Sequence, residues 1–425
     1  MTARTLSDWL AWQETLHPST IALGLERVAT VKDRLALAQP APVVITVGGT
    51  NGKGSCVAML EAIYRAAGYR TGAYTSPHLL RYNERVRVNG VDVDDDALCA
   101  SFVRIDQARG DTSLTYFEFG TLAALDIFAR APLDVVILEV GLGGRLDAVN
   151  VVDADVALIT TIGIDHTEYL GPDRESIGFE KAGILRAQKP VVCGDPNPPL
   201  SLLRHAQQLN APLYCYQRDF RVQPQADGWT WTGLGQSRAA LPQPRMRGAY
   251  QLQNAASVLA VVQLLQETLP VAQSHIRDGL ASALVPGRFQ YLPTKVPTIL
   301  DVAHNPHAAE ALAQTLQAQT IQGRTLAVFG MLKDKDIAGV VRALAPWIAE
   351  WHCISLPGPR GAQAWELANV LQAESVSGLV VLHGDIEDAY AAAAAVACER
   401  DRIVVFGSFY TVAGLLAMGI MNRSI

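Results

Sequence analysis

The sequence has no run of basic residues and no excess of positive charge. Its 35 lysines and arginines are outnumbered by 41 aspartates and glutamates, which gives a net charge of −6 at pH 7. Nucleic-acid binding relies on clustered Lys and Arg that neutralise phosphates, so we expect no nucleic-acid partner. The net charge does not argue against an anionic small molecule, because it does not report the local field in a cleft.

Cysteines are few and scattered. No two of the six stand in a CxxC spacing, which disfavours a zinc site and a disulfide framework. Reduced thiols in a cytosol fit this pattern better, and we expect a cytoplasmic protein. The six are Cys56, Cys99, Cys193, Cys215, Cys353 and Cys398.

Long hydrophobic runs are missing as well. The apolar stretch 389–398 is mostly alanine, lies between Asp388 and Glu399, and is too short to span a bilayer. The N-terminal segment contains Asp8, Glu14 and two tryptophans, which is not the composition of a signal peptide. We therefore expect no membrane partner, and we interpret 389–398 as a helix with one buried face.

The sequence does contain enough apolar residues for more than one core. Of its 425 residues 49% are hydrophobic and 18% charged, and this length favours two domains. Strand-like runs alternate with helical patterns, which predicts α/β architecture with doubly wound sheets. The alternating segment Trp229–Thr232 predicts a small antiparallel β region. The Pro-Gly pair within Val285–Arg288 is the best candidate for a domain boundary.

The stretch from Val43 to Ser55 organises the first half of the chain. An apolar β-branched run leads into Gly48-Gly49-Thr50-Asn51-Gly52-Lys53-Gly54-Ser55, and a helical pattern follows. This is the order of a phosphate-binding loop, whose N–H groups, lysine and helix N-terminus hold phosphates. The match is imperfect, because the usual pattern places the hydroxyl residue directly after the lysine. A glycine-rich turn with an incidental lysine is the alternative.

Other polar clusters also follow predicted strands. They are Ser76, the segment Glu139–Asp147, and the pair Asp165-His166. Parallel strands end at one edge of a sheet, so we expect these clusters to converge with the phosphate-binding loop there. Glu139 alone could simply face solvent, but beside such a loop a Mg²⁺ role is the better interpretation. Asp165-His166 fits a solvent-exposed turn or a metal or phosphate contact equally well, since His is an unusual Mg²⁺ ligand.

Three further sites are ambiguous from their residues alone. Lys181 beside Glu180 is most often a surface ion pair. The segment Asp301–Pro306 could be a capped helix start or a set of polar groups that face a nucleotide. Ser408 stands where a strand opens toward a helix, and such a turn can hold an anion.

The ordered motifs together resemble folylpolyglutamate synthase, a member of the Mur ligase superfamily. Two N-terminal segments, Leu23–Val28 and Leu114–Phe119, resemble the bacterial bifunctional form, which is also a dihydrofolate synthase. One departure is visible: Phe179 replaces the Arg that often precedes Glu-Lys-Ala-Gly, so a cationic role at 179 is in doubt. The motifs are Thr50–Ser55, Thr75–Leu79, Glu139–Ala148, His166–Gly171, Glu180–Ile184 and Asp301–Pro306.

The resemblance implies a P-loop, doubly wound ATPase domain with a small β region at 1–286, which binds Mg-ATP and folate. It implies a Rossmann-like, glutamate-binding α/β domain at 287–425. The matched catalytic positions are Lys53, Lys181, His166, Asp301 and His304. The matched ATP-binding positions are Gly49, Thr50, Asn51, Gly52, Lys53, Gly54, Ser55, Asn254, Arg288 and Asp301. The matched metal positions are Ser55, Ser76, Glu139, His166 and Lys181; the folate positions are Leu25, Thr115, Phe117, Asp147 and Ala148; the glutamate positions are His304 and Ser408.

The implied reaction is ATP-dependent amide formation. L-Glutamate is joined to 7,8-dihydropteroate and to tetrahydrofolates through an acyl phosphate, with two Mg²⁺ ions and a carbamylated Lys181. We expect a monomer whose partners are these small molecules. A polyglutamylase without dihydropteroate activity is the main alternative. A Mur-type ligase for nucleotide-linked peptidoglycan precursors usually carries a further N-terminal domain, and a P-loop switch module would leave Glu139, His166 and Lys181 without a role.

Overall fold

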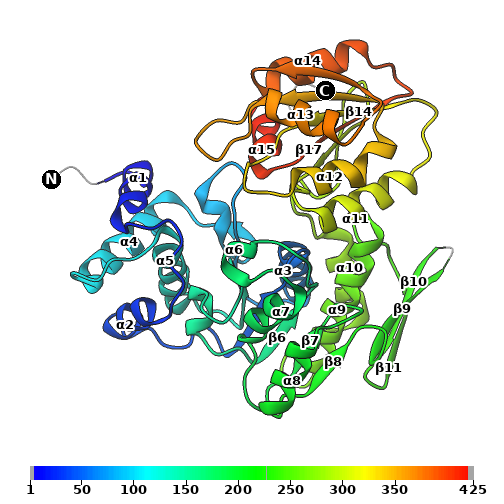
Figure 1. Cartoon of the computed structure of the whole chain (residues 1–425). Helices are drawn as coiled ribbons and strands as arrows, with labels where there is room; N and C mark the ends of the chain where they lie inside the picture. The colour runs from blue at the N-terminus through cyan, green and yellow to red at the C-terminus, as the bar shows by residue number, and fades with distance from the viewer. Residues whose placement is uncertain (1–3, 226, 420–425) are drawn as a thin grey trace. The chain divides into compact units, whose positions relative to one another are not determined.

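The computed structural model describes residues 4–225 and 227–419, which form two compact units (Figure 1). The first unit comprises the described residues up to 245 together with 252–284. The second comprises 246–251 and the described residues from 285 onward. Each unit is built around its own sheet, so each is described separately.

The first unit contains an eight-stranded sheet in the order β4-β3-β2-β5-β1-β6-β7-β8. In this order the strands β2, β5, β1, β6, β7 and β8 pair in parallel. Strand β3 pairs antiparallel with β2, and β3 and β4 form an antiparallel hairpin that turns at Asn89-Gly90. The strands are β1 (Val43–Gly48), β2 (Thr71–Tyr74), β3 (Val86–Val88), β4 (Val91–Asp92), β5 (Val135–Glu139), β6 (Val156–Ile159), β7 (Val191–Cys193) and β8 (Leu213–Cys215).

The strand register places the C-terminal ends of β1, β5 and β6, which precede the polar clusters of the sequence, level with one another. Val47 of β1 is paired with Glu139 of β5, and Gly48 is paired with Ile159 of β6. All residues of these three strands are buried, and all are apolar except Thr46, Gly48 and Glu139. Such a composition is expected for parallel strands that are covered on both faces. The loops after β1, β5 and β6 therefore start side by side.

Helices cover both faces of this sheet. On one side α1 (Leu6–Leu16), α2 (Glu26–Arg34), α4 (Asp95–Arg109) and α5 (Tyr116–Arg130) build one apolar core with the sheet residues Val44, Tyr74, Val136 and Leu138. Helix α10 (Gln273–Ser282) packs on α3 (Lys53–Ala66), where Gly279 lies directly against Ile63. The remaining helical segments are α6 (Thr167–Leu170), α7 (Arg174–Ala182), α8 (Leu200–Gln208), α9 (Ala249–Leu264), η1 (Tyr82–Arg85) and η2 (Ala148–Val151).

The predicted small β region is present as a three-stranded antiparallel sheet. It consists of β9 (Phe220–Gln225), β10 (Gly228–Gly233) and β11 (Gln236–Leu241) in the order β11-β10-β9. Trp229 and Trp231 are fully buried, and the Trp231 indole donates a 3.0 Å hydrogen bond to the carbonyl of Ala256 in α9. The alternating tryptophans of β10 are thus the residues that attach the small sheet to α9.

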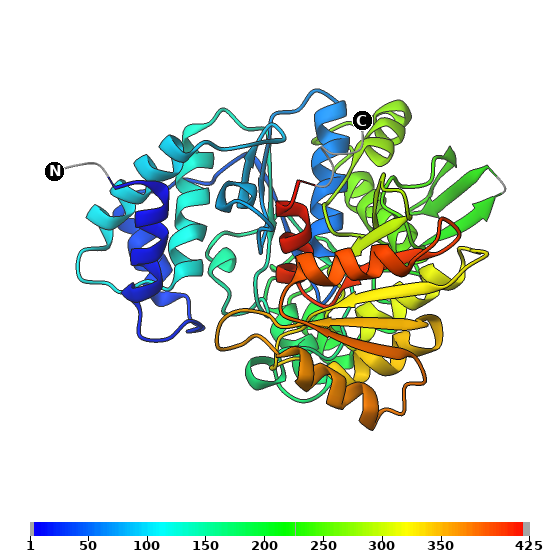
Figure 2. The same ribbon diagram turned by 90° about the horizontal axis from the view of Figure 1, so that it is seen from above.

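The second unit contains a six-stranded sheet in the order β12-β13-β17-β14-β15-β16, parallel except for β12. Helices α11 (Pro306–Gln317), α12 (Ile337–Leu344) and α13 (Ala364–Ala373) build the core on one face, and α14 (Ile386–Val396) and α15 (Phe409–Ala417) lie on the other (Figure 2). A short η3 (Ala345–Trp347) follows α12. The strands are β12 (Gln290–Leu292), β13 (Thr298–Asp301), β14 (Thr325–Phe329), β15 (Glu350–Ile354), β16 (Leu379–His383) and β17 (Arg402–Phe406).

The predicted fold class is confirmed in both units. The apolar stretch 389–398 lies largely in α14, whose buried residues are Ala389 and Ala393. Within residues 4–225 and 227–419, no helix combines the length and the apolar content that crossing a bilayer requires.

Candidate active site

The loop between β1 and α3 has a backbone that only glycine can supply. Gly49 and Gly52 have φ of 142° and 89°. A Cβ at Gly49 would stand 1.9 Å from Thr160 Oγ1, and one at Gly52 would stand 2.6 Å from Asn254 Oδ1. Lys53 opens α3, and its Nζ donates to the carbonyls of Gly49 (3.0 Å) and Thr50 (3.2 Å). The ammonium group therefore lies over the loop, as a phosphate-binding lysine does.

The same loop is bonded to the end of β6. The Thr50 amide donates to the Thr161 carbonyl at 2.7 Å, and the Thr50 hydroxyl both donates to the Gly163 carbonyl (3.1 Å) and accepts from its amide (3.0 Å). Thr160 Oγ1 donates to the Asn51 carbonyl at 2.6 Å. Sequence analysis missed Thr160 and Thr161, because it placed both inside a strand predicted at Asp155–Ile162, whereas β6 ends at Ile159 and the two threonines directly follow it.

His166 lies on the segment that these bonds hold. It has a left-handed backbone (φ 52°), is the N-cap residue of α6, and has a side chain that is 37% exposed. Its amide donates to its neighbour Asp165 Oδ1 at 2.8 Å. Asp195 also holds this segment, because it accepts a hydrogen bond from the Ile162 amide (2.8 Å) and forms an ion pair with Arg174 (3.0 Å).

Glu139 does not face solvent. It is 5% exposed, and its Oε2 accepts a 3.1 Å hydrogen bond from the amide of Ser76 at the end of β2. A Cβ at Gly54 would lie 3.7 Å and 3.8 Å from its two carboxylate oxygens, so the carboxylate also lies against the first turn of α3, beside buried Ser55. A carboxylate near serine residues is a hard oxygen donor set, which suits Mg²⁺ completed by phosphate and water.

The described residues contain no group of three or more His, Cys, Asp and Glu side chains arranged to hold a metal ion. This finding is consistent with the oxygen donor set at Glu139, since Mg²⁺ is commonly held by one or two carboxylates plus substrate phosphates. The residues around Glu139 therefore fit Mg²⁺ better than zinc.

Lys181 is not a surface residue paired with Glu180. It is 3% exposed, and Glu180 instead forms an ion pair with Arg145 at 2.8 Å. Burial, reinforced by the positive charge of Lys53, lowers the pKa of Lys181 to about 7, while Asp165 and Asp147 oppose the shift. Lys53, Lys181 and Asp165 thus lie within electrostatic range of one another, and burial favours the neutral form of the Lys181 amine.

The predicted folate residues come from three segments of the first unit. Thr115 caps α5, and the ring of half-buried Phe117 lies directly over Gly141, where a Cβ would meet it at 2.5 Å. Asp147 is buried and accepts from the amides of Leu142 (2.8 Å) and Val149 (3.0 Å). Burial raises the pKa of Asp147 to about 6.

The other two predicted folate residues flank this cluster. Ala148 follows Asp147 as the first residue of η2 and is 3% exposed. Leu25 is the N-cap residue of α2, and its neighbour Gly24 donates to the Leu146 carbonyl at 3.3 Å. The structure therefore brings the folate candidates of the sequence to one place.

The candidates of the second unit gather at the ends of β13 and β17. Asp301 is paired in register with Phe406, and its carboxylate accepts from the amides of Phe289 (2.9 Å) and Ala303 (2.8 Å). Burial raises the pKa of Asp301, against the opposing charge of Arg288. Arg288 and His304 both contact the ring of Phe409, at 5.6 Å and 5.9 Å from its centroid.

Ser408 completes this group as the N-cap of α15, where its Oγ accepts from the Thr411 amide at 3.0 Å. His304 Nδ1 lies 2.7 Å from the Val302 carbonyl, which fixes the ring. Asn254 belongs to the first unit, where its amide group lies against Gly52 of the phosphate-binding loop. Phe409 is a residue that sequence analysis missed.

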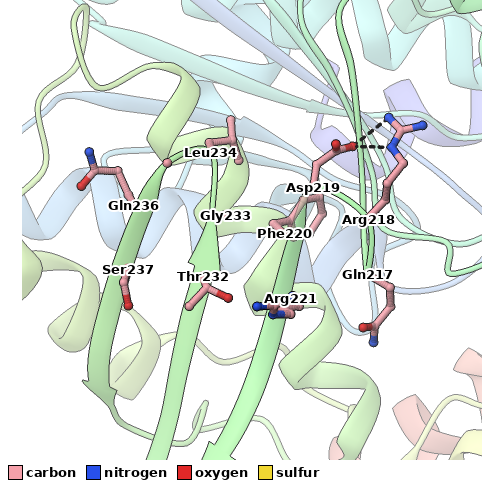
Figure 3. Close-up of a pocket in the computed structure, with 11 residues that line it drawn as sticks. Gln217, Arg218, Asp219, Phe220, Arg221, Thr232, Gly233, Leu234, Gln236 and Ser237 are labelled. Carbon is pink, nitrogen blue, oxygen red and sulfur yellow. Dashed lines mark hydrogen bonds and ion pairs between the residues drawn. The ribbon is translucent and has the colours of Figure 1, made fainter.

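A separate cavity of about 440 Å³ lies at one end of the small sheet (Figure 3). Its wall includes the ion pair of Arg218 with Asp219 at 2.7 Å. None of the predicted site residues is among those that line it: Gln217, Arg218, Asp219, Phe220, Arg221, Thr232, Gly233, Leu234, Gly235, Gln236 and Ser237.

Comparisons with known proteins agree with this geometry. Residues 47–216 match the Mur ligase middle domain, and residues 287–409 match the Mur ligase glutamate ligase domain. The dihydrofolate synthase/folylpolyglutamate synthase of Escherichia coli K12 is 48% identical over 422 residues, which cover 99% of this chain and 97% of that protein.

Two solved structures are similar over the whole chain. One is E. coli FolC in complex with DHPP and ADP, with a TM-score of 0.94, 48% identity and 99% coverage of both chains. The other is a bifunctional folylpolyglutamate synthase/dihydrofolate synthase with Mn, AMPPNP and L-glutamate bound, with a TM-score of 0.90, 50% identity and 98% coverage of both chains. The chain therefore belongs to the dihydrofolate synthase/folylpolyglutamate synthase family of Mur ligases.

Proposed function

We propose that this protein is an ATP-dependent ligase with two related activities. It joins L-glutamate to 7,8-dihydropteroate, which gives dihydrofolate, and it adds L-glutamate to the γ-carboxylate of tetrahydrofolates. The observation that carries this proposal is the grouping of Lys53, Glu139 and Lys181 around one glycine-rich loop, in a chain similar over its full length to bifunctional enzymes.

The reaction has two steps. The acceptor carboxylate attacks the γ-phosphorus of ATP, which breaks the bond to ADP and gives an acyl phosphate. The amino group of L-glutamate then attacks the acyl carbon, loses a proton and expels phosphate. Lys53 and the loop amides hold the phosphates in place, and such positioning can supply about 7–11 kcal/mol of the barrier in the best cases.

We propose that two Mg²⁺ ions are held by Ser55, Ser76, Glu139, His166 and a carbamylated Lys181. When bound, these ions would neutralise charge on the phosphates. The pKa of about 7 supports carbamylation of Lys181, because only a neutral amine adds to CO₂. The product is a carboxylate, which would replace a buried cation beside Lys53 with an oxygen ligand.

The remaining roles follow the same division of the chain. Residues 1–286 would bind Mg-ATP through Gly49–Ser55 and Asn254, and folate through Leu25, Thr115, Phe117, Asp147 and Ala148. Residues 287–425 would bind glutamate through His304 and Ser408, with Arg288 and Asp301 as ATP contacts. We further propose a cytoplasmic monomer that acts on small molecules and not on nucleic acid.

The test is phosphate release from Mg-ATP with L-glutamate, measured in parallel with 7,8-dihydropteroate and with a tetrahydrofolate. We expect turnover with both acceptors. Turnover with tetrahydrofolate alone would favour the monofunctional alternative and remove the pterin roles of Thr115, Phe117, Asp147 and Ala148. Phosphate release that needs no acceptor would favour a nucleotide switch, and the ligase proposal would then be wrong.

A further inference from the structure

An ion pair joins two parts of the first unit that are 91 residues apart in sequence. Arg27, on the first turn of α2, donates from Nε to both carboxylate oxygens of Glu118 (3.1 Å and 3.2 Å) and from Nη2 to Oε1 at 2.7 Å. The Glu118 side chain is 4% exposed and that of Arg27 is 27% exposed. A fork of this kind fixes orientation as well as distance.

Each member of the pair also fixes its own segment. Glu118 Oε2 accepts from the Thr115 amide at 2.7 Å, while Thr115 Oγ1 accepts from the Glu118 amide at 3.2 Å, so the carboxylate orders the turn that carries Thr115 and Phe117. Arg27 Nη2 donates to the Ala22 carbonyl at 2.7 Å, which orders the loop that carries Leu25. One side-chain pair thus sets the spacing between two groups of folate candidates.

The third group of candidates is connected to both. Gly24 donates to the Leu146 carbonyl at 3.3 Å, beside Asp147, and the Phe117 ring rests on Gly141, whose loop leads to Asp147. A shift of α2 against α5 would therefore reach all three segments. The hydrogen bonds of the pair to other residues go to Ala22 and Thr115, and neither of these is among the predicted catalytic or metal positions.

We propose that Arg27 and Glu118 are positioning residues that decide how well the enzyme uses dihydropteroate relative to tetrahydrofolate. This inference rests on the function proposed above. In dihydropteroate the reacting carboxylate is carried directly by the benzoate ring, which only a short –CH2–NH– link joins to the pterin, so displacement of the pterin is passed on to the carboxylate through few rotatable bonds. In a tetrahydrofolate the reacting γ-carboxylate lies at the end of a flexible glutamyl chain, which can absorb such a displacement.

The test compares three variants by steady-state kinetics with both acceptors. Arg27→Gln removes the fork, and Arg27→Lys keeps the charge but cannot form the same paired hydrogen bonds. The control is Arg104→Gln, because Arg104 pairs with Asp126 near the other end of the same helix α5, at 2.5 Å and with similar side-chain exposure (32% and 0%). Thermal unfolding of each variant measures the structural cost separately.

We expect Arg27→Gln to lower kcat/KM for dihydropteroate by about 30–100-fold, the size of effect that a misplacement of about 1 Å produces. Tetrahydrofolate turnover should fall less than about threefold, and Arg27→Lys should lie between Arg27→Gln and the parent in its acceptor ratio. Arg104→Gln should lower thermal stability without changing that ratio. If Arg27→Gln does not fold, Arg27→Gln combined with Glu118→Gln removes the buried unpaired carboxylate and tests the same ratio.

Two results would overturn the inference. One is an equal loss with both acceptors in Arg27→Gln. The other is an equal change of the ratio in Arg104→Gln. A parent enzyme that turns over neither acceptor would instead show that the proposed function is wrong, and the inference would fall with it.

Discussion

The first strand of the parallel sheet in each unit leads into a helix, and the two helices begin differently. In the first unit β1 leads to α3, whose N-cap is Gly52, a residue with no side chain to cap the helix. In the second unit β13 leads to α11, whose N-cap Asn305 accepts from the Ala308 amide at 2.9 Å, with Pro306 at the next position. The same strand-loop-helix arrangement therefore has two different N-termini.

The difference concerns which group satisfies the helix N-terminus. The N-terminus of α11 is bonded by its own asparagine, and that of α15 by its own Ser408. The N-terminus of α3 has no side-chain cap, and both the helix dipole and the ammonium group of Lys53 place positive charge there. A glycine thus stands in place of the capping residue in the one unit where we propose that phosphate binds.

The largest expected effect comes from removing the lysine of the first unit. Lys53→Ala should lower ATP turnover by at least about 10³-fold, because the variant loses the ammonium group that stabilises the negative charge of the transferred phosphate. Phosphate release under saturating acceptor measures this loss. Lys189→Ala is the control, since Lys189 is half exposed and pairs only at the surface with Asp155 at 2.9 Å. Near-normal turnover of Lys53→Ala would remove the phosphate role of this loop.

The second effect concerns the buried lysine. Lys181→Ala should lower turnover by about 10²–10³-fold, the size typical for loss of one electrostatic group. Acetate or propionate at high concentration should restore part of the activity, because a short carboxylic acid can occupy the space of the proposed carbamate. Full activity, or a loss that no carboxylic acid relieves, would show that Lys181 does not act as a carboxylate.

The fold could be predicted from sequence because its signals are local. The runs Val43–Gly48 and Val135–Glu139 are apolar enough to require burial on both faces, and Thr5 is a typical N-cap residue for the helix α1 that follows it. Short strands gave weaker signals. Strands β7, β8 and β12 contain three residues each, and their pairing depends on neighbours distant in sequence.

The site could be predicted only in part. The glycines, Lys53 and the acidic strand end of Glu139 are visible in sequence, because a glycine-rich segment with a lysine after an apolar run, and a carboxylate at the end of another apolar run, are unusual patterns. Burial of Lys181 was not visible, because it depends on segments that fold over it from elsewhere. The Arg27–Glu118 pair was missed for the same reason, since neither residue marks its partner 91 positions away.

The third effect is a pH dependence of stability in the first unit. Burial raises the pKa of Asp147 to about 6 from a value of about 3.9 in an unfolded chain. Between these values the folded protein binds more protons than the unfolded one, so this group lowers the free energy of unfolding as pH rises from 4 to 6. The full penalty applies above pH 6 and amounts to at most about 3 kcal/mol.

Asp147→Asn removes this titration. The free energy of unfolding, measured in urea, should rise in the variant relative to the parent as the pH increases from 4 to 7. A difference between the two proteins that does not change with pH would mean that Asp147 titrates normally in the fold. The comparison uses the pH dependence alone, so any constant effect of the new amide cancels.

The fourth effect tests the glycine start of α3. Gly52→Ala places a Cβ at φ 89° and 2.6 Å from Asn254 Oδ1, so the loop or Asn254 must move. The left-handed backbone alone costs about 1–2 kcal/mol for a residue other than glycine. We expect the KM for ATP to rise by about tenfold, as measured by initial rates against ATP concentration. An unchanged KM would show that the loop tolerates a side chain and that its shape does not govern ATP binding.

The smallest effect tests the capped start of α11. Asn305→Ala removes the side chain that accepts from Ala308, which should cost about 1 kcal/mol of stability. For a unit of this size the midpoint of thermal unfolding should fall by roughly 2–4 °C. The KM for ATP should stay within about twofold of the parent value, because this N-terminus is bonded by its own residue and is not proposed to hold phosphate. Gly52→Ala and Asn305→Ala thus separate the two kinds of helix start: the first should act mainly on ATP and the second mainly on stability. A rise in KM for ATP in Asn305→Ala as large as in Gly52→Ala would mean that the N-terminus of α11 affects ATP binding as much as that of α3 does.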